Sequence, residues 1–462
     1  MVIEREVLVV GGGPTGSVVA TLLAQWGRDV LLVGDDSRAG GLPIETVVPG
    51  AATTLERLGF QDALGSCARL GPRQHGRCWS NPTLQLEEVN EDQRGWRFRR
   101  PDLDQWLRQK AQDSGVEVID GARARDTLCP TGRGEVVFDQ NGESFVVDAQ
   151  LIIAATGRSS GAPLLPVETG QRLPEMIALS AIVDSPDSNE DASVIEAVSQ
   201  GWIWWLPFGD GRASVALFCD PSEIRDRGRA EVWKSALGQS QGAAHDFDKT
   251  STRGTLATAR YHHNAGGLLI AGDAISAIDP LSSQGLEKAF VSAEETALAA
   301  ETALLGEADL KTMVDQRQRW ELRLFRMHRQ RALALYHAET RFEEHPFWAV
   351  RHQLDIDPIQ AAARPTGRLT PAAGLTQESR WIRNGNRLVP RPAIRLADSD
   401  EESIDQVGQV PTGVILQLVG DELPMHQLAQ RAATVPALID QSPASLSQIL
   451  GEMCRLELLI EN

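Results

Sequence analysis

The apolar positions near the start of the chain follow the pattern of a parallel α/β unit. Residues 5–10 form a short apolar run typical of a buried strand, and Gly11-Gly-Gly-Pro-Thr-Gly16 follows it directly. An apolar helical stretch then extends to Trp26, and a second apolar run covers residues 29–33. This order of strand, glycine-rich turn, helix and strand predicts the opening of a doubly wound sheet.

The next two hundred or so residues divide into two patterns. A helix is predicted over residues 100–114, a strand over 116–119 and a buried strand over 149–157. Residues 166–262 instead alternate apolar and polar positions between many turn signals. That alternation predicts a half-exposed antiparallel sheet inserted into the α/β domain.

The rest of the chain predicts a return to the first domain and then a separate unit. Residues 266–271 form an apolar run typical of a strand, and long helical patterns continue to about residue 353. A stretch rich in Pro, Gly, Arg and Asn (365–392) and an acidic patch (398–405) predict a linker.

The last fifty or so residues predict a small unit of their own. Three short helices are expected at 414–419, 423–433 and 445–456, with a possible closing strand at 456–460. The size is that of a winged-helix bundle, but the third helix has one Arg and no Lys. We therefore expect a module that docks a peptide or partner, or a stability cap, rather than a DNA-binding domain.

Taken together, the predicted fold class is α/β. It has a Rossmann-type dinucleotide-binding domain, an inserted antiparallel sheet for substrate, and a small, mainly α, winged-helix-like C-terminal domain. The boundaries we predict are 1–165 with 263–360 for the first domain, 166–262 with part of 70–100 for the sheet, 361–405 for the linker and 406–462 for the last domain.

Composition narrows the function classes. The chain has 462 residues, 42% of them hydrophobic, and a formal net charge of −18. This charge argues against partners that are nucleic acids or anionic membrane surfaces. The five cysteines are scattered without a C-x-x-C pair, and neither a signal peptide nor a membrane-length apolar run is present. We expect a cytoplasmic globular protein.

The glycine-rich turn has a chemical role in this context. Gly11 would permit the tight turn, Gly13 would let the backbone approach a pyrophosphate, and Gly16 would let helix and strand pack closely. The acid that binds the adenosine ribose is expected after the second strand, where Gly34 stands. We predict that Asp35 substitutes for it, with its neighbour Asp36 as the alternative.

A second segment predicts where a flavin would lie. Gly272-Asp273 ends the strand at 266–271, and Asp279-Pro280 forms a turn before a helix that begins near Ser283-Gln284-Gly285. The N–H groups and dipole of a helix start favour a negative partner, such as the N1–C2=O edge of a reduced flavin. Asp273 would accept a ribityl or phosphate-side hydroxyl.

These motifs resemble the FAD-dependent monooxygenases of the group that includes flavin halogenases. The matching features are Gly11–Gly16, Arg100 with Asp104, Ala155-Thr-Gly-Arg-Ser159, the segment 272–285 and Gly201-Trp-Ile-Trp-Trp-Leu-Pro207. The resemblance covers roughly residues 1–350. It implies FAD as the cofactor, and it assigns as cofactor-binding the residues Gly11, Gly13, Pro14, Gly16, Asp35, Arg100, Gly157, Gly272, Asp273, Pro280, Ser283, Gln284 and Gly285.

The resemblance also decides between chemistries. Halogenases of the group use a lysine after the first two strands, whereas the first lysine here is Lys110. Halogenation is therefore disfavoured. What the resemblance implies is oxygen transfer, in which reduced flavin and O₂ form a C4a-hydroperoxide. Electrons would come from NAD(P)H directly or from a separate flavin reductase.

Candidate substrate and acid–base residues are few. Trp202 and Trp204 should share one face of a strand and Trp205 should lie on the other, as a substrate wall or as packing. Glu45, in a loop similar to the family's flavin-side loop, and His75 are the catalytic candidates. No metal is expected, because His262-His263 lacks a third ligand.

The predicted function is hydroxylation of an aromatic, indole-type ring. The substrate is either a small molecule or a peptidyl tryptophan on a protein partner. With a peptidyl tryptophan as substrate, the chain is similar to the flavoproteins that hydroxylate tryptophan during tryptophylquinone maturation of amine dehydrogenases. The alternatives are an FAD-dependent reductase or dehydrogenase of the prenyl-reductase type and a non-catalytic flavoprotein that recruits partners.

Overall fold

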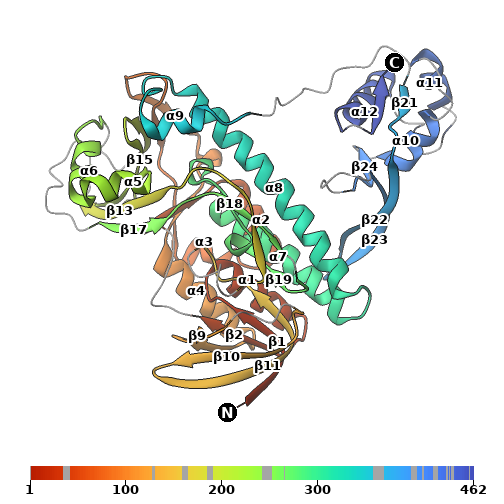
Figure 1. Ribbon diagram of the computed structural model, residues 1–462, viewed down its shortest axis with the longest axis horizontal. Coiled ribbons are helices and arrows are strands. Elements are labelled where there is room, and N and C mark those ends of the chain that lie inside the picture. The colour runs from red at the N-terminus through yellow and green to blue at the C-terminus, as the bar shows by residue number, and fades with distance from the viewer. Residues whose placement is uncertain are drawn as a thin grey trace. The chain divides into compact units, whose positions relative to one another are not determined.

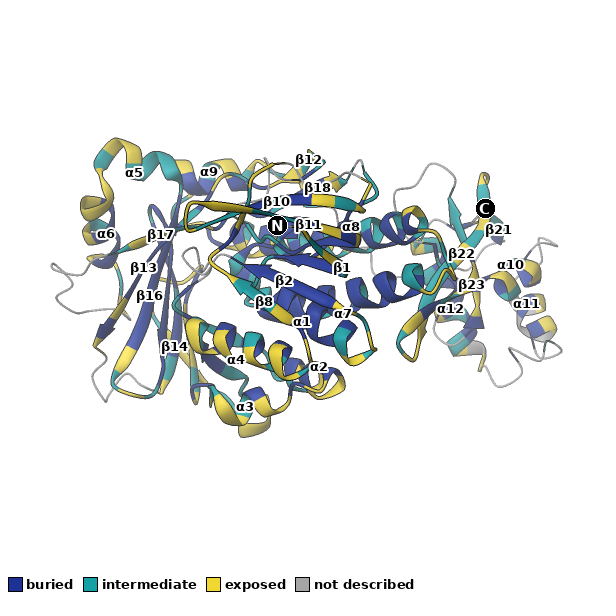
Figure 2. Cartoon of the chain, turned by 90° about the horizontal axis from the view of Figure 1, so that it is seen from below, coloured by how far each residue is buried: buried dark blue, intermediate teal, exposed yellow. Residues whose placement is uncertain are grey.

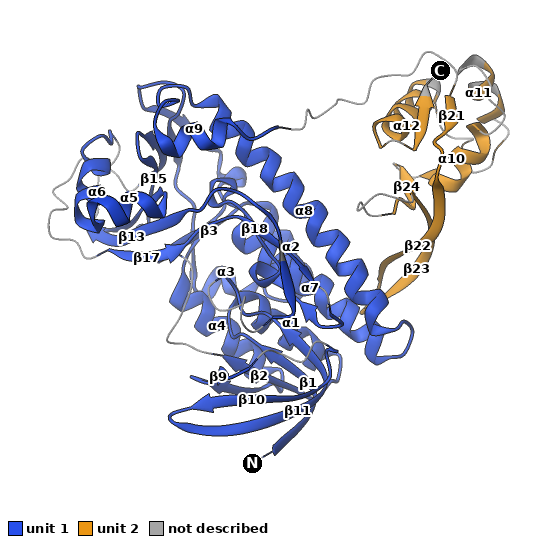
Figure 3. Cartoon of the chain, in the orientation of Figure 1, with its two compact units in different colours: residues 1–356 blue, residues 357–462 orange. Residues whose placement is uncertain are grey.

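A computed structural model gives the chain as two compact units, residues 1–356 and 357–462 (Figure 3). The structure describes residues 2–34, 42–126, 131–158, 165–184, 191–241, 252–264, 266–356, 369–396, 403–407, 410–419, 425–432, 435, 438, 442–456 and 458–461.

The first unit is built on a mainly parallel sheet (Figure 1). Its order is β8-β2-β1-β11-β10-β9, with β19 also paired to β11. The pairs β8·β2, β2·β1, β1·β11 and β11·β19 are parallel, whereas β10 is antiparallel to both its neighbours. The strands are β1 (Val2–Val10), β2 (Val30–Gly34), β8 (Glu117–Asp120), β9 (Arg123–Ala124), β10 (Gly134–Gln140), β11 (Glu143–Ala154) and β19 (Leu269–Ile270).

The predicted strands and helices of this domain are present, with two of the strands longer than expected and the strand predicted at 266–271 reduced to β19. β1 starts before residue 5 and β11 before residue 149, because their outer ends pair with each other from Val2 and Val146 onward. Helix α1 contacts α7 and α4. The helices are α1 (Pro14–Gln25), α2 (Gly50–Leu58), α3 (Asp62–Ser66), α4 (Arg100–Asp113), α7 (Gly285–Leu304), α8 (Leu310–Ala338) and α9 (Pro346–His352).

The predicted second sheet exists, with seven strands in the order β17-β13-β16-β15-β14-β5-β6. It includes two strands from the 70–100 region, as expected. It is not wholly antiparallel, because β14 and β5 pair in parallel. The strands are β5 (Gln74–Cys78), β6 (Gln85–Glu88), β13 (Ile177–Asp184), β14 (Ala192–Val198), β15 (Gly201–Pro207), β16 (Arg212–Cys219) and β17 (Arg253–Leu256).

The expectation of a half-exposed sheet is wrong for its central strands. All seven residues of β15 are buried, and so are most residues of its neighbours β14 and β16 (Figure 2), whereas the edge strand β6 is exposed. Helix α6 (Arg229–Leu237), which follows α5 (Pro221–Arg227), places Val232 and Trp233 in one core cluster with Trp205. The opposite face of the central strands belongs to the larger core cluster of the unit, so both of their faces are covered.

Two three-stranded sheets complete the first unit. One has the order β3 (Ile44–Val47), β7 (Trp96–Arg99) and β4 (Ala68–Leu70). The other joins β12 (Val167–Arg172) and β18 (Arg260–Asn264) to β20 (Ser276–Ala277). The two ends of the 166–262 segment thus pair outside the large inserted sheet.

The second unit contains the three predicted helices and the closing strand. They are α10 (Thr412–Val419), α11 (Met425–Ala432), α12 (Pro443–Arg455) and β26 (Leu459–Glu461), which pairs with β21 (Leu369–Pro371). Most of the described part of the predicted linker is not a linker. It forms the hairpin of β22 (Leu375–Asn384) and β23 (Arg387–Leu396), followed by the short pair β24 (Gln406–Val407) and β25 (Val410–Pro411).

None of the helices described here combines the length and the hydropathy that crossing a bilayer requires.

Candidate flavin site

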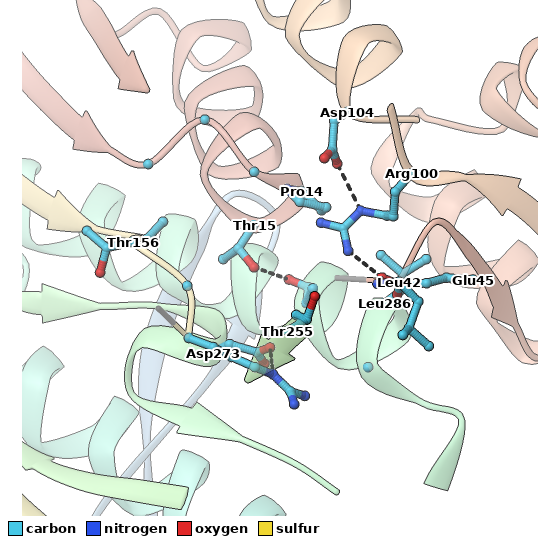
Figure 4. A pocket seen from close by; sticks show the side chains of 18 of the residues that line it. Pro14, Thr15, Leu42, Glu45, Arg100, Asp104, Thr156, Thr255, Asp273 and Leu286 are labelled. Carbon is cyan, nitrogen blue, oxygen red and sulfur yellow. Dashed lines mark hydrogen bonds and ion pairs between the residues drawn. The ribbon is translucent and has the colours of Figure 1, made fainter. Parts of the chain in front are cut away.

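A cavity of about 520 Å³ opens where the carboxyl ends of β1, β2 and β11 meet the start of α1 (Figure 4). This edge of a parallel sheet is where α/β proteins bind ligands. The lining comes from segments far apart in the sequence, and includes Gly11–Thr15, Gly34, Leu42, Glu45, Arg100, Asp104, Ala155–Arg158, Trp204, Phe218, Thr255–Ala257, Asp273, Pro280, Ser283, Gly285 and Leu286.

The glycine-rich turn forms one wall of this cavity. At Gly11, where φ is +120°, a Cβ would lie 2.2 Å from the carbonyl oxygen of Ala155. At Gly16 a Cβ would lie 1.8 Å from the carbonyl oxygen of Gly11, so the helix and the turn touch there. At Gly13 a Cβ would meet nothing within 4 Å. Because no side chain caps α1, its first N–H groups are available to an anion.

Asp273 supplies a hydrogen-bond acceptor in the same cavity. One of its carboxylate oxygens accepts a 2.8 Å bond from Arg158 Nε, and the other, Oδ1, is buried without a partner. Burial acts to raise the pKa of Asp273, but the charges of Arg158 and Lys288 outweigh burial and lower the pKa. The ionised Oδ1 is therefore suited to accept a ligand hydroxyl.

The turn before α7 lies at another part of the wall. Asp279 accepts a 2.9 Å hydrogen bond from the Leu281 amide and so caps the short 3₁₀ turn Pro280–Ser282. Ser283 is left-handed, with φ of 51°, which lets α7 begin two residues later without a side-chain cap. The helix starts where the sequence predicted, with its N-terminus at the cavity.

Arg100 is held between two carboxylates (Figure 4). Its Nη1 lies 2.6 Å from Glu45 Oε1, and its Nε lies 3.2 Å from Asp104 Oδ1. Glu45, expected above as an acid–base candidate, is thus an ion-pair partner of Arg100 in the wall of the cavity.

The three tryptophans of β15 differ in their surroundings. Trp204 lines the cavity together with Phe218, and its indole N–H donates to Ser193 Oγ over 3.1 Å. Trp202 stacks on Phe218 with ring centroids 3.8 Å apart and does not line the cavity. Trp205 belongs to the core on the other face of the sheet. The predicted alternation of the three side chains is present, and Trp204 is the one that reaches the cavity.

The predicted cofactor-binding residues and His75 divide into four groups. Gly11, Gly13, Pro14, Arg100, Gly157, Asp273, Pro280, Ser283 and Gly285 line the cavity, whereas Gly16, Gly272 and Gln284 adjoin lining residues. His75 is exposed on β5 and does not line it. Asp35 and Asp36 lie outside the described residues.

The sequence did not predict two features of the cavity wall: the ion pair of Arg158, and the lining by Phe218 and residues 255–257. Arg158 follows the predicted Gly157 directly, but its ion pair with Asp273 joins residues more than a hundred positions apart. Phe218 and residues 255–257 have no local motif, and only strand pairing brings them to the cavity. Among the described residues, no group of three or more His, Cys, Asp or Glu could hold a metal ion.

The residues present fit FAD. The turn at Gly13 leaves open space beside the helix start for a pyrophosphate, Asp273 Oδ1 offers an acceptor for a hydroxyl of the ribityl chain, and the start of α7 faces the cavity for a flavin edge. The aromatic pair Trp204 and Phe218 lines the part contributed by the inserted sheet.

Comparison with known proteins agrees with this reading. Residues 4–319 match the family described as FAD binding domain. A curated relative, digeranylgeranylglycerophospholipid reductase 2 of Methanopyrus kandleri, is 30% identical over 336 residues, which are 69% of this chain and 82% of the relative.

Two solved structures match almost the whole chain. One is described as the peptidyl tryptophan dihydroxylase QhpG, essential for tryptophylquinone cofactor biogenesis. It has a TM-score of 0.74 and 21% identity, and the match covers 98% of this chain and 100% of that one. The other is CmlS, a flavin-dependent halogenase, with a TM-score of 0.76, 19% identity and coverage of 99% and 96%. At these identities the likeness establishes the fold.

Proposed function

Since the chain belongs to the FAD binding domain family and is an FAD-dependent oxidoreductase, we propose that it is a monooxygenase that hydroxylates an indole-type ring. The substrate is a tryptophan presented by a peptide or protein partner. The observation that supports this most directly is the Trp204–Phe218 wall, which belongs to the same cavity as the flavin cradle. An aromatic substrate packs favourably against aromatic rings.

In this proposal the residues of the chain bind and orient. The helix start at Gly13–Thr15 holds the pyrophosphate, Asp273 accepts a ribityl hydroxyl, and the N-terminus of α7 holds the pyrimidine edge of the flavin. When bound and reduced, FAD supplies the activation of O₂. Trp204 and Phe218 hold the substrate ring and keep water from the reacting face.

Halogenation has less support. No lysine is found among the described residues that line the cavity, so the amine that directs hypohalous acid in the related halogenases has no equivalent there. The buried Lys288 does not replace it, because its ammonium is occupied by Glu321 and by the carbonyl oxygen of Gly272.

The electron source belongs to the same proposal. In the described part of the chain the β1–α1 turn is the single glycine-rich dinucleotide turn. NAD(P)H would therefore bind transiently and reduce the flavin, or a separate flavin reductase would deliver the electrons.

Reduction of a carbon–carbon double bond is the second candidate function. The relative that is 30% identical to this chain is a digeranylgeranylglycerophospholipid reductase. The match covers 82% of the length of that relative. The two functions differ in product mass, because hydroxylation adds oxygen and reduction adds two hydrogens.

The test is a single-turnover experiment. The holo-protein is reduced with dithionite, freed of excess dithionite, mixed with ¹⁸O₂ and a tryptophan-containing peptide, and read by mass spectrometry. We expect a gain of one ¹⁸O atom on the indole, because the two electrons of one reduced flavin support insertion of one oxygen atom while the other leaves as water. A gain of two hydrogens on an isoprenoid substrate, with no labelled peptide, would replace the proposal by the reductase function.

Replacing Trp204 by alanine tests the aromatic wall. We expect about a tenfold fall in kcat/KM for the peptide and more H₂O₂ released per turnover, since the ring loses a packing partner and water enters. FAD content should be unchanged, because Trp204 lies on the inserted sheet. Trp202→Phe, which keeps the stack on Phe218, is the control, and equal kinetics in both variants would contradict a substrate role for Trp204.

A further inference from the structure

Three arginines from separate segments gather around Phe208 and Asp210: two of them lie beside the ring of Phe208, and the third pairs with Asp210. Arg69 lies on β4, Arg99 ends β7 and Arg212 begins β16. The guanidinium carbon of Arg69 is 5.2 Å, and that of Arg99 4.6 Å, from the ring centroid of Phe208. We refer to Arg69, Arg99 and Arg212 as the arginine cluster.

The cluster is held in place by the backbone around it. Arg69 Nη1 donates to the carbonyl oxygen of Gly209 over 2.7 Å. The neighbouring Arg97, 6% exposed, donates to the carbonyl oxygens of Leu70 and Pro207 and so fastens β7 to the end of β15. Guanidinium groups fixed in advance lose little conformational freedom when they bind an anion.

Positive charge is in excess at this place. Among the described residues, Asp210 is the one carboxylate within ion-pair distance of the cluster; it lies 3.3 Å from Arg212 and closer to Arg99, and Arg69 has no carboxylate within that distance. The chain as a whole has a net charge of −18. Burial, followed by repulsion from Arg212 and Arg69, lowers the pKa of Arg99, although Asp102 opposes this. A second anion would relieve the repulsion.

The cluster adjoins the substrate side of the cavity. Phe208 follows Trp204 along the same segment, and Pro207, three residues beyond Trp204, is roughly 10 Å from it along an extended strand. Thr46, which lines the cavity, is the register partner of Arg97 in the β3–β7 pair. None of the three arginines lines the cavity, but an anion on the cluster would stand near the end of β15, roughly 10 Å from Trp204.

We propose that the arginine cluster binds an acidic segment of the polypeptide that presents the aromatic residue. The inference rests on the proposed function, since it assumes a peptide substrate. Carboxylates pair with guanidinium groups in a bidentate manner. A separation of roughly 10 Å corresponds to about three residues of extended chain, which places the acidic residues about three positions from the target ring.

Binding to the oxidised holoenzyme tests this without turnover. The probe is a fluorescein-labelled peptide that contains one tryptophan. On each side of the tryptophan, two glutamates begin three positions away from it. The matched probe has glutamines in place of these glutamates. We expect the glutamate peptide to bind about tenfold more tightly at low salt, and less so at high salt. In Arg69→Gln/Arg212→Gln the preference should fall below about twofold.

A matched variant controls for net charge. Arg172→Gln/Arg225→Gln removes two positive charges, as the test variant does, from exposed positions on β12 and α5, and it should keep the tenfold preference. Equal binding of the two peptides by the wild type, including no binding of either, would overturn the inference. The inference is also overturned if Arg69→Gln/Arg212→Gln keeps the preference for the glutamate peptide. It is likewise overturned if that double variant loses affinity for NADPH and keeps its affinity for the peptide.

The outcome separates the two proposals. If the glutamate peptide binds through the cluster but no peptide ever gains oxygen, the docking inference stands and the hydroxylation fails. If oxygen is transferred equally well to both peptides with equal KM, the hydroxylation stands and the docking inference fails.

Discussion

Gly16→Ala should yield a protein that purifies nearly colourless and binds FAD at least about 100-fold more weakly, equivalent to about 3 kcal/mol. The added methyl carbon would lie 1.8 Å from the carbonyl oxygen of Gly11, a backbone atom that can move only with the turn. α1 would then be displaced from the turn, and its N–H groups would no longer converge on the pyrophosphate. Flavin absorbance after purification and fluorescence-quenching titration measure the effect.

Two other glycines make this prediction specific. Gly65→Ala in α3 also introduces a Cβ but meets nothing within 4 Å, so it should bind FAD as the wild type does. Gly13→Ala should fold normally, because its Cβ also meets nothing in the protein, yet it should bind FAD more weakly. A yellow Gly16→Ala protein with wild-type affinity would show that the turn is not the pyrophosphate site.

Glu321→Gln should lower the free energy of unfolding by about 3–5 kcal/mol. The Glu321 carboxylate is fully buried and lies 3.2 Å from Lys288 Nζ and 2.9 Å from Arg317 Nη2, both of which are also buried. Without the carboxylate, two cations remain in the core with no carboxylate between them. Urea denaturation followed by tryptophan fluorescence measures the loss.

The same substitution should also weaken FAD binding. Lys288 donates to the carbonyl oxygens of Gly272 and Ser276, which flank Asp273, so a displaced Lys288 releases the segment that bears the ribityl acceptor. Asp315→Asn is the control on the same helix, since its pair with Lys311 is exposed and should change stability by less than about 0.5 kcal/mol. Equal unfolding curves for the two variants would contradict the importance of the buried network.

The inserted sheet shows how far strand patterns alone can lead. Alternation in β15 correctly separated Trp205 from Trp202 and Trp204, because successive side chains of a strand point to opposite faces. It could not say which face meets the flavin cavity. That depends on α6 covering the Trp205 face and on β5 pairing in parallel with β14. Neither feature has a signal within the strand itself.

The sequence by itself determined the two ends of the flavin cradle, the β1–turn–α1 unit and the segment from β19 to the start of α7. The positions of the two turns and of the helix starts follow from local signals, the glycine spacing at 11–16 and the Asp279 cap of Pro280–Ser282, so local patterns are sufficient to locate them. Only the tertiary structure decided that Arg158 pairs with Asp273, that Glu45 is held by Arg100, and that Arg69 and Arg99 meet beside Phe208. These contacts join residues that are far apart in the sequence, and they exist because strand order and crossovers, rather than sequence proximity, bring the segments together.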